Sequence, residues 1–354
     1  MGQLAEQRLQ NQRLKRAGLR GPADVVAWFG AVQAQEYGPA KWGLAQRMSR
    51  RTTDAAIDRA VAQGEILRTH VLRPTWHFVT PADIRWMLEL TAPQVHRRMS
   101  TYDRQLGLDA RVMTRAATVF ERALGDGEYL TRAELGVHLA RAGLPGDGSR
   151  LAHLAMYAEL EGVICSGPRR GKRFTYALLA DRAPHARSLQ RDEALAELSR
   201  RYFRSHGPAT IRDFVWWSGL KTADAKRGLE MNRAKSHEAD GLTYWTVGRK
   251  PVSTSSRGSV HLLPIYDEFL VAYRDRAAVP RAAYSIANFW HALLAGGSVA
   301  GTWRTAPKGS GCMLNVTTLR PLTRAERSGL AKAVARYERF LEQPVTLSTL
   351  GGSQ

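Results

Sequence analysis

Residues 163–179 read VICSGPRRGKRFTYALL, two alternating apolar runs on either side of a Gly-Pro-Arg-Arg-Gly-Lys turn. This alternation predicts a β-hairpin with a basic tip. Three segments with apolar residues at helical spacing precede the hairpin: RVMTRAATVFERAL (111–124), TRAELGVHLARAG (131–143) and SRLAHLAMYAELEG (149–162). Thr131 and Glu134 form a capping box at the start of the second segment. Three helices followed by a hairpin is the order of elements in a winged helix-turn-helix.

Three helices are predicted twice more, followed by a hairpin within residues 25–81 and by a single strand, GLTYWTVG, within residues 192–248. After residue 256 the pattern changes to strand-like alternation, and a second capping box at Thr323 and Glu326 opens a final helix. We therefore expect an α+β, mainly α protein with three tandem winged helix-turn-helix modules followed by a C-terminal β-barrel-like domain. The expected boundaries are 1–105, 106–184, 185–255 and 256–354.

The chain is strongly basic, with 52 Lys and Arg against 32 Asp and Glu, a net charge of +20 over 354 residues. Each of the four predicted segments is positively charged, so the excess does not come from one tail. A positive electrostatic potential spread over the whole chain favours binding to a polyanion such as nucleic acid. The basic residues at the tip of the second hairpin would suit phosphate groups: Arg169, Arg170, Lys172 and Arg173. The alternatives are a general arginine bias in composition and a solvated hairpin on a protein-binding module.

Other classes of protein are disfavoured by what the sequence contains. Cys165 and Cys312 lie far apart, which argues against a disulfide framework or a zinc site. The polar N-terminus does not resemble a signal peptide, and no apolar run approaches the ~18 residues that span a bilayer. We expect a cytoplasmic protein without a membrane partner, a metal or a cofactor. GxSxG, Walker A and HExxH motifs do not occur.

The first predicted hairpin, LRTHVLRPTWHFVTP (67–81), is dense in side chains that bind phosphates and stack on bases. Its candidate DNA contacts are Arg68, Thr69, His70, Arg73, Thr75, Trp76 and His77. The alternative is a packed hairpin core with one hydrogen-bonded histidine. GTWRT (301–305) would place Trp303 and Arg304 at a hairpin turn, as a wedge or phosphate clamp; a packed tryptophan is the alternative.

Two neighbouring acids, Asp267 and Glu268, occur in LLPIYDEFLVAYRDR (262–276). On a strand they would point to opposite faces and could not form an acid/base pair. We interpret them as surface carboxylates paired with Arg274 and Arg276. The alternative is a hydrolase in which Asp267 activates water.

Gln33 and Gln35 stand in AVQAQEYGPAKWGLAQR (31–47). On a helix their side chains would point about 200° apart, whereas in an extended chain they would share a face. Gly38-Pro39 disfavours helical geometry nearby, so a helix ending around Val32 would let both amides converge. Taken alone, two glutamines at an exposed helix end usually have no special role.

Four blocks in order resemble the AlkZ/YcaQ-type winged-helix DNA glycosylases: QAQEYGPAKWGLAQR, ILRTHVLRPTWHFVTPADIRWML, LLPIYDEFLVAYRDR and VAGTWR. The resemblance covers nearly the whole chain and implies three winged helices and a C-terminal β-barrel around a concave DNA-binding cleft. It places the catalytic motif, glutamine–apolar–glutamine or aspartate, at Gln33, Ala34 and Gln35. Ala34 is smaller than the usual middle residue. The double-glutamine form is associated with self-resistance of antibiotic producers to their own DNA-alkylating products.

The resemblance predicts a monofunctional glycosylase that releases N7-alkylated, cationic purines from double-stranded DNA, including bulky adducts or interstrand crosslinks. Such a base leaves without being protonated, so a weakly basic amide that positions water suffices and unmodified purines are spared. The resemblance implies that Gln35 positions the water and that Gln33 makes supporting contacts to the lesion or the DNA. Lys41 should be turned away by its helix, so no lyase step is expected. We expect a monomer associated with the nucleoid in a bacterial cytoplasm; the alternative is a non-enzymatic winged-helix transcriptional regulator.

Overall fold

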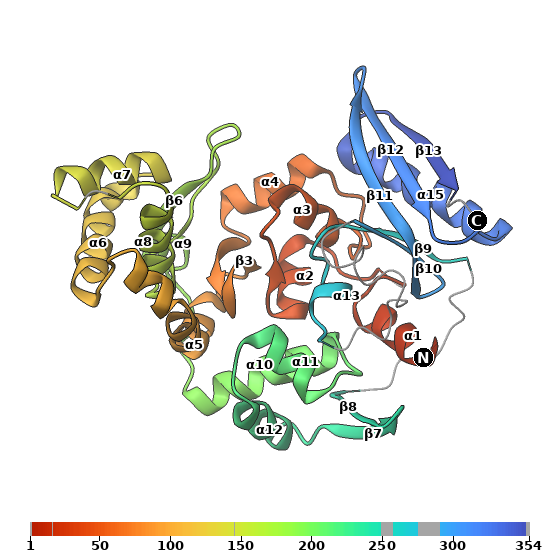
Figure 1. The fold of residues 1–354 in the computed structure, drawn as a ribbon, viewed down its shortest axis with the longest axis horizontal. Coiled ribbons are helices and arrows are strands. Elements are labelled where there is room, and N and C mark those ends of the chain that lie inside the picture. Colours follow the sequence, from red (N-terminus) through yellow and green to blue (C-terminus); the bar gives the residue numbers. More distant parts are fainter. Residues whose placement is uncertain (1, 16, 145, 249–257, 275–290, 352–354) are drawn as a thin grey trace.

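The computed structural model describes residues 2–15, 17–144, 146–248, 258–274 and 291–351 (Figure 1). It has the mixed α+β character expected from the sequence. The predicted boundary at 255/256 and the predicted partner Arg276 lie outside the described residues.

The first group of elements lies at the centre of the molecule in Figure 1. Its strands form a three-stranded antiparallel sheet in the order β1-β3-β2. The Thr53 hydroxyl accepts from the Ala56 amide to start the fourth helix, which ends at Gly64 in left-handed geometry. The elements are α1 (Gly2–Asn11), α2 (Pro22–Phe29), β1 (Val32–Gln33), α3 (Tyr37–Ala45), α4 (Asp54–Gln63), β2 (Leu67–Val71), β3 (Arg73–Val79) and α5 (Ile84–Gln105).

The second group confirms the three helices and the hairpin predicted for residues 111–179. The predicted capping box is present, with the Thr131 amide donating to Glu134 Oε2 at 2.7 Å. This group has a core cluster of its own, which includes Phe120, Leu135 and Leu154. The elements are α6 (Ala110–Ala123), a 3-10 turn (Gly125–Gly127), β4 (Leu130–Thr131), α7 (Arg132–Arg141), α8 (Gly148–Leu160), β5 (Ile164–Ser166), β6 (Thr175–Leu178) and α9 (Leu179–Arg182).

The third group again has three helices and then a hairpin. Its last strand was predicted at residues 241–248, whereas the strand that pairs with it, β7, was not predicted. The elements are α10 (Arg191–Ser205), α11 (Ile211–Ser218), α12 (Thr222–Met231), β7 (Lys235–Ala239) and β8 (Leu242–Thr246).

The C-terminal part corrects one expectation, because its described strands form an open five-stranded sheet, not a barrel. The order is β13-β12-β11-β10-β9, with β13 parallel to β12 and the other pairs antiparallel. The final helix packs on this sheet, and its predicted capping box at Thr323 and Glu326 is confirmed. The elements are β9 (Val260–Leu263), α13 (Glu268–Val271), β10 (Ala292–Ala295), β11 (Ser298–Lys308), β12 (Gly311–Thr318), α15 (Arg324–Leu341) and β13 (Val345–Gly351).

Buried apolar clusters join the first group to its neighbours. One cluster combines Val71 and Trp86 of the first group with Tyr202 and Trp217 of the third. Another combines Phe78 with residues of the C-terminal sheet and α15. The β1-β3-β2 sheet therefore has packing partners from distant parts of the chain on both sides.

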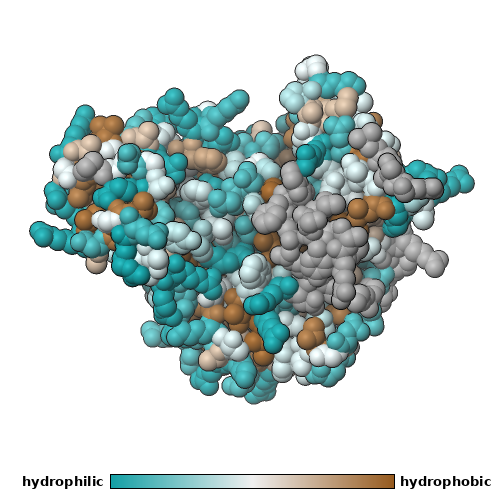
Figure 2. Space-filling view, viewed as in Figure 1, coloured by the Kyte–Doolittle hydropathy of each residue, from teal (hydrophilic) through white to brown (hydrophobic). Residues whose placement is uncertain are grey.

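In the space-filling view, the upper outline of the molecule dips between the second group and the β11–β12 hairpin (Figure 2).

Candidate active site

Within the Gln-Ala-Gln stretch, Gln33 lies in the extended strand β1 and Gln35 lies in a bend. Helix α2 ends at Phe29, and Gly30 follows with φ of 90°, a conformation that favours glycine. Val32 and Gln33 then pair with Phe78 and His77 of β3. The Gly38-Pro39 pair does not end a helix; it lies in the first turn of α3, where the missing proline amide costs no hydrogen bond.

Both glutamine side chains are held by donors on β3. Gln33 is buried, and its Oε1 accepts from Arg73 Nη2 at 2.7 Å. Gln35 Oε1 accepts from the main-chain amide of Trp76 at 3.2 Å. A guanidinium and a main-chain amide can only donate, so the atom facing each must be the amide oxygen. Among the described residues, neither side-chain NH2 group has a hydrogen-bond partner.

The main chain of the motif is held as firmly as its side chains. The Ala34 amide donates to the Trp76 carbonyl at 2.7 Å. Arg68 Nε donates to the Ala34 carbonyl at 3.0 Å, and its Nη2 reaches the Gln35 carbonyl at 3.4 Å. Burial lowers the pKa of Arg68 to about 10, still well above neutral, so its donors stay charged.

Glu268 also holds the motif, which corrects the interpretation of the two acids as surface carboxylates. Its Oε1 accepts from the Gln33 amide at 2.8 Å, and its Oε2 accepts from Trp217 Nε1 at 3.0 Å. His206 Nε2 lies 3.1 Å from the same oxygen. The side chain of Glu268 is 1% exposed. It begins α13 and is not on a strand, so the argument from strand alternation does not apply.

Asp267 is buried as well and forms a two-point ion pair with Arg47, at 2.8 and 2.9 Å. Its predicted pairing with Arg274 is wrong; the Arg274 main-chain amide instead donates to Asp213. The sequence signal for both burials was the apolar run on either side of the two acids in LLPIYDEFLVAY. Arg47 and Glu268 were missed as supports of the site.

Several residues of the first hairpin proposed as DNA contacts are buried. Thr69, His70 and His77 are buried, and His70 is paired with Glu159 of α8. His77 Nδ1 donates to the Thr75 carbonyl at 2.8 Å, and burial lowers the pKa of His77 well below 6.5, so the ring is neutral. The burial of these three side chains agrees with the alternative interpretation, in which the hairpin residues pack as a core. Their assignment as surface phosphate contacts is corrected, because they are enclosed by protein.

The remaining hairpin residues divide by the direction of their contacts. Arg73 turns toward Gln33, and Arg68 toward the motif backbone, so neither projects from the surface as a phosphate contact. Trp76 is half-buried, with the Arg68 guanidinium 4.3 Å from its ring centroid and the His70 ring at 4.4 Å. Thr75 is also half-buried.

The basic tip of the second hairpin is exposed at Arg170, Lys172 and Arg173 and half-buried at Arg169. Arg170 pairs with Glu134, while the Arg169 guanidinium lies 5.1 Å from the ring centroid of exposed Phe174. Phe174 also packs on the guanidinium of Arg68 at 4.6 Å, so this hairpin lies beside the glutamine motif.

Trp303 is not at a turn, which corrects its predicted placement. It lies within β11 opposite Val316, is buried, and donates from Nε1 to the Leu263 carbonyl at 2.8 Å. The packed alternative is therefore the correct one for this ring. Arg304, next on the strand, is exposed.

Lys41 points away from the glutamines, as predicted. Its ammonium binds Asp54 at 2.7 Å and Asp58 at 2.9 Å on α4, and its side chain is buried.

Within the described part of the chain, no group of three or more His, Cys, Asp or Glu could hold a metal ion, and no helix is long and apolar enough to cross a membrane.

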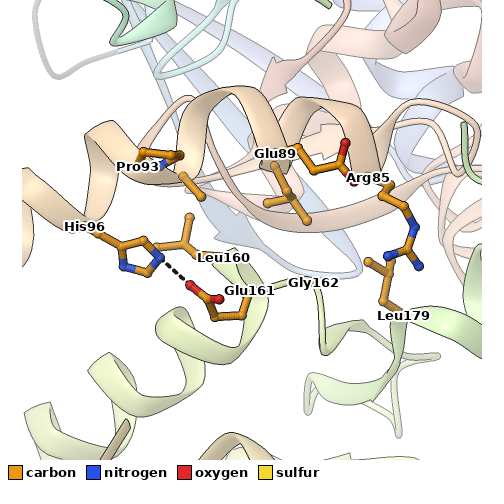
Figure 3. Close-up of a pocket in the computed structure, with 10 residues that line it drawn as sticks. Arg85, Glu89, Pro93, His96, Leu160, Glu161, Gly162 and Leu179 are labelled. Atoms are coloured by element: carbon orange, nitrogen blue, oxygen red, sulfur yellow. Dashed lines mark ion pairs between the residues drawn. The ribbon is translucent and has the colours of Figure 1, made fainter. Parts of the chain in front are cut away.

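A hollow of about 250 Å³ lies elsewhere, between α5 and the end of α8 (Figure 3). It is lined by residues that include Arg85, Glu89, His96 and Glu161, and His96 Nε2 lies 2.9 Å from Glu161. None of the glutamine-motif residues lines it, so this hollow is not the candidate active site.

Comparisons with known proteins show the family of this chain. The family model described as DNA glycosylase AlkZ-like matches residues 26–340. The chain belongs to the AlkZ-like DNA glycosylase family. The interstrand DNA cross-link repair glycosylase of Streptomyces sahachiroi is 27% identical over 325 residues, covering 84% of this chain and 85% of that protein. The solved structure of Streptomyces sahachiroi DNA glycosylase AlkZ superposes with a TM-score of 0.82 at 21% identity, covering 99% of each chain.

Family membership confirms the resemblance predicted from the four sequence blocks and makes this protein a glycosylase, an enzyme that hydrolyses N-glycosyl bonds in DNA. The structural match confirms the α+β architecture. The assignment of each helical group as a winged helix-turn-helix stays a prediction.

Proposed function

We propose that this protein is a monofunctional glycosylase that releases N7-alkylated purines from double-stranded DNA, with Gln33 and Gln35 as its catalytic residues. The observation that carries the proposal is the fixed orientation of both amides by Arg73 and the Trp76 amide. Neutral groups oriented in advance can position water and favour a developing positive charge without acting as strong bases.

The two glutamines have different partners, which suggests different roles. Gln33 Oε1 faces a cationic guanidinium, which draws electron density from it and weakens it as an acceptor. Gln35 Oε1 faces a neutral amide and keeps a second lone pair. Gln35 is therefore the better acceptor for the attacking water, and Gln33 is left to donate from its NH2 group to the DNA.

In the proposed reaction the water oxygen forms a bond to C1′ of the deoxyribose and the glycosidic C–N bond breaks. The electron pair of that bond neutralises the alkylated base, and the proton from water passes to solvent. The leaving group carries its positive charge beforehand, so no acid is required. An abasic site and a free base are the products.

We further propose that the DNA lies along the basic tip of the β5–β6 hairpin, with Arg169, Arg170, Lys172 and Arg173, and near Arg304 on β11. The β5–β6 hairpin and the β11–β12 hairpin point to the same side of the molecule in Figure 1. In this proposal residues 1–105, 106–184 and 185–255 are winged helix-turn-helix modules and residues 256–354 form the C-terminal domain. The protein would act as a monomer on the nucleoid of a bacterial cytoplasm.

The test is base release from a duplex that carries 7-methylguanine, with wild type, Gln33→Ala, Gln35→Ala and the double variant. Loss of a water-positioning group should slow release by roughly 10- to 1,000-fold. Gln63→Ala, at an exposed position on α4, is the matched control and should leave release unchanged. Wild type that binds one operator sequence and releases no base from methylated or crosslinked DNA would support a transcriptional regulator instead.

The relative from Streptomyces sahachiroi is named for interstrand crosslink repair, and we propose that this chain also acts on bulky or crosslinked N7 adducts. A duplex crosslinked through guanine N7 atoms provides the test. Wild type should convert it to separable strands on a denaturing gel, and the double glutamine variant should not. Release of 7-methylguanine with no effect on the crosslink would restrict the substrate to small adducts.

A further inference from the structure

Two residues of opposite charge flank Gln33 from distant parts of the chain. Glu268 accepts from the Gln33 main-chain amide at 2.8 Å, and Arg73 donates to the Gln33 side-chain oxygen at 2.7 Å. The first contact spans 235 residues of sequence and the second spans 40. Both partners are set by the fold and not by the local sequence around Gln33.

The contact with Glu268 fixes the main chain of Gln33. Pairing with His77 on β3 fixes the same residue from the other side. With the backbone held, the remaining freedom lies in the side chain, whose two ends differ only in oxygen and nitrogen. An unconstrained amide can rotate so that either end faces the substrate.

Arg73 removes that freedom. Its guanidinium has no acceptor atom, so it cannot face the NH2 end of Gln33. Burial lowers the pKa of Arg73, while the negative charge of Glu268 opposes that change. Among the described residues, the bond from Nη2 to Gln33 is the only side-chain hydrogen bond of Arg73, and its buried Nε has no partner.

We propose that Arg73 is a positioning residue that holds the Gln33 oxygen inward and so presents the Gln33 NH2 group to an acceptor oxygen of the DNA. The inference rests on the proposed catalytic role of Gln33. It assigns Arg73 a role inside the site, in place of the DNA contact predicted from the sequence.

The experiment is a double-mutant cycle on single-turnover release of 7-methylguanine. Arg73→Met keeps most of the apolar stem and removes the donors. We expect release at saturating protein to fall roughly tenfold or more, as for loss of a hydrogen bond to a charged group, with a smaller change in DNA affinity. In the Gln33→Ala background the same change should have little further effect, because no amide remains to be oriented.

Arg182→Met is the matched control. Arg182 is also half-buried, but it donates to the main-chain carbonyls of Val61 and Ala62 and does not touch the motif. The rate of base release by the Arg182→Met variant should stay within about twofold of the wild-type rate. Arg73→Lys supplies a second variant that keeps the charge, and it should restore part of the rate lost in Arg73→Met.

The outcomes separate the two proposals. If Gln33→Ala is slow and the losses from Arg73→Met and Gln33→Ala multiply, the positioning role is refuted and the catalytic role of Gln33 stands. If Gln33→Ala releases base at the wild-type rate, the catalytic assignment fails and the role of Arg73 fails with it.

Discussion

Asp83, immediately before α5, is a buried carboxylate on which we expect the stability of the molecule to depend. Its Oδ2 accepts from Arg201 Nη1 at 2.6 Å and from the Thr80 hydroxyl at 2.7 Å. Its Oδ1 accepts from Trp86 Nε1 at 3.0 Å and from Arg187. Arg201 belongs to α10, so this carboxylate connects the first group of elements to the third.

The lowered pKa of Asp83 gives the size of its contribution to the free energy of unfolding. Burial alone would raise this pKa, but the hydrogen bonds and charge of Arg201 outweigh it and lower the pKa from 3.8 to about 2. A tenfold change in proton affinity corresponds to about 1.4 kcal/mol, so the ionised carboxylate contributes about 2 kcal/mol to folding. Removing one member of a buried pair costs about 3 to 5 kcal/mol. Arg201 keeps a second partner, Glu197, so we expect Asp83→Asn to cost about 3 kcal/mol at pH 6.

The sign of the pH dependence follows from the lowered pKa. The contribution is complete above the unfolded-state pKa near 4 and disappears as the pH falls through about 2, so about half of it remains at pH 3. Urea unfolding of wild type and Asp83→Asn at pH 6 and pH 3 measures it, and the difference between them should shrink by about 1 kcal/mol at the lower pH.

Asp192→Asn provides the control for Asp83→Asn. It removes an exposed ion pair with Arg227 and should cost less than about 1 kcal/mol. An effect of Asp83→Asn that is equally small, or that does not change between pH 6 and pH 3, would refute the reasoning.

Three further changes test the site and its surroundings. Arg68→Met removes the donors to the Ala34 and Gln35 carbonyls and should slow base release by roughly tenfold in a single-turnover assay; an unchanged rate would mean that β3 and Glu268 hold the motif without Arg68. Lys41→Met should retain base release, and borohydride should trap no protein–DNA adduct with either protein; an adduct that depends on Lys41 would reveal a lyase step. Lys172→Ala should weaken binding to any duplex and reduce the slope of log affinity against log salt by about 1, whereas an unchanged slope would remove this hairpin from the DNA face.

The sequence predicted the elements whose signals are local. The helices of the second group follow from apolar residues at helical spacing, and the capping boxes at Thr131 and Thr323 correctly mark the starts of α7 and α15. The basic hairpin between β5 and β6 follows from alternation around a glycine-containing turn. In each case the residues that determine the element lie within a few positions of one another.

The parts of the site that were missed depend on long-range pairing. A strand of two residues, Val32 and Gln33, has no periodicity that a sequence can display, and it exists because β3 pairs with it. Glu268 looks like a surface acid by residue type, yet donors from β1 and α11 make its burial possible. Trp303 was placed at a turn because β11, with 11 residues, is longer than its alternating pattern indicated.

The charged residues packed around Gln33 explain why neutral residues can stand at the centre of the proposed site. The charges of Arg73 and Glu268 are buried around Gln33 and act on it through fixed hydrogen bonds. A carboxylate at position 33 would pair with Arg73 and carry its own charge into the site. An amide can be oriented by the same charges and remain neutral, so in the proposed reaction the positive charge would come from the alkylated base. In the proposed reaction, selectivity for alkylated purines would then follow from the weakness of Gln33 and Gln35 as bases, with the surrounding fold supplying their orientation.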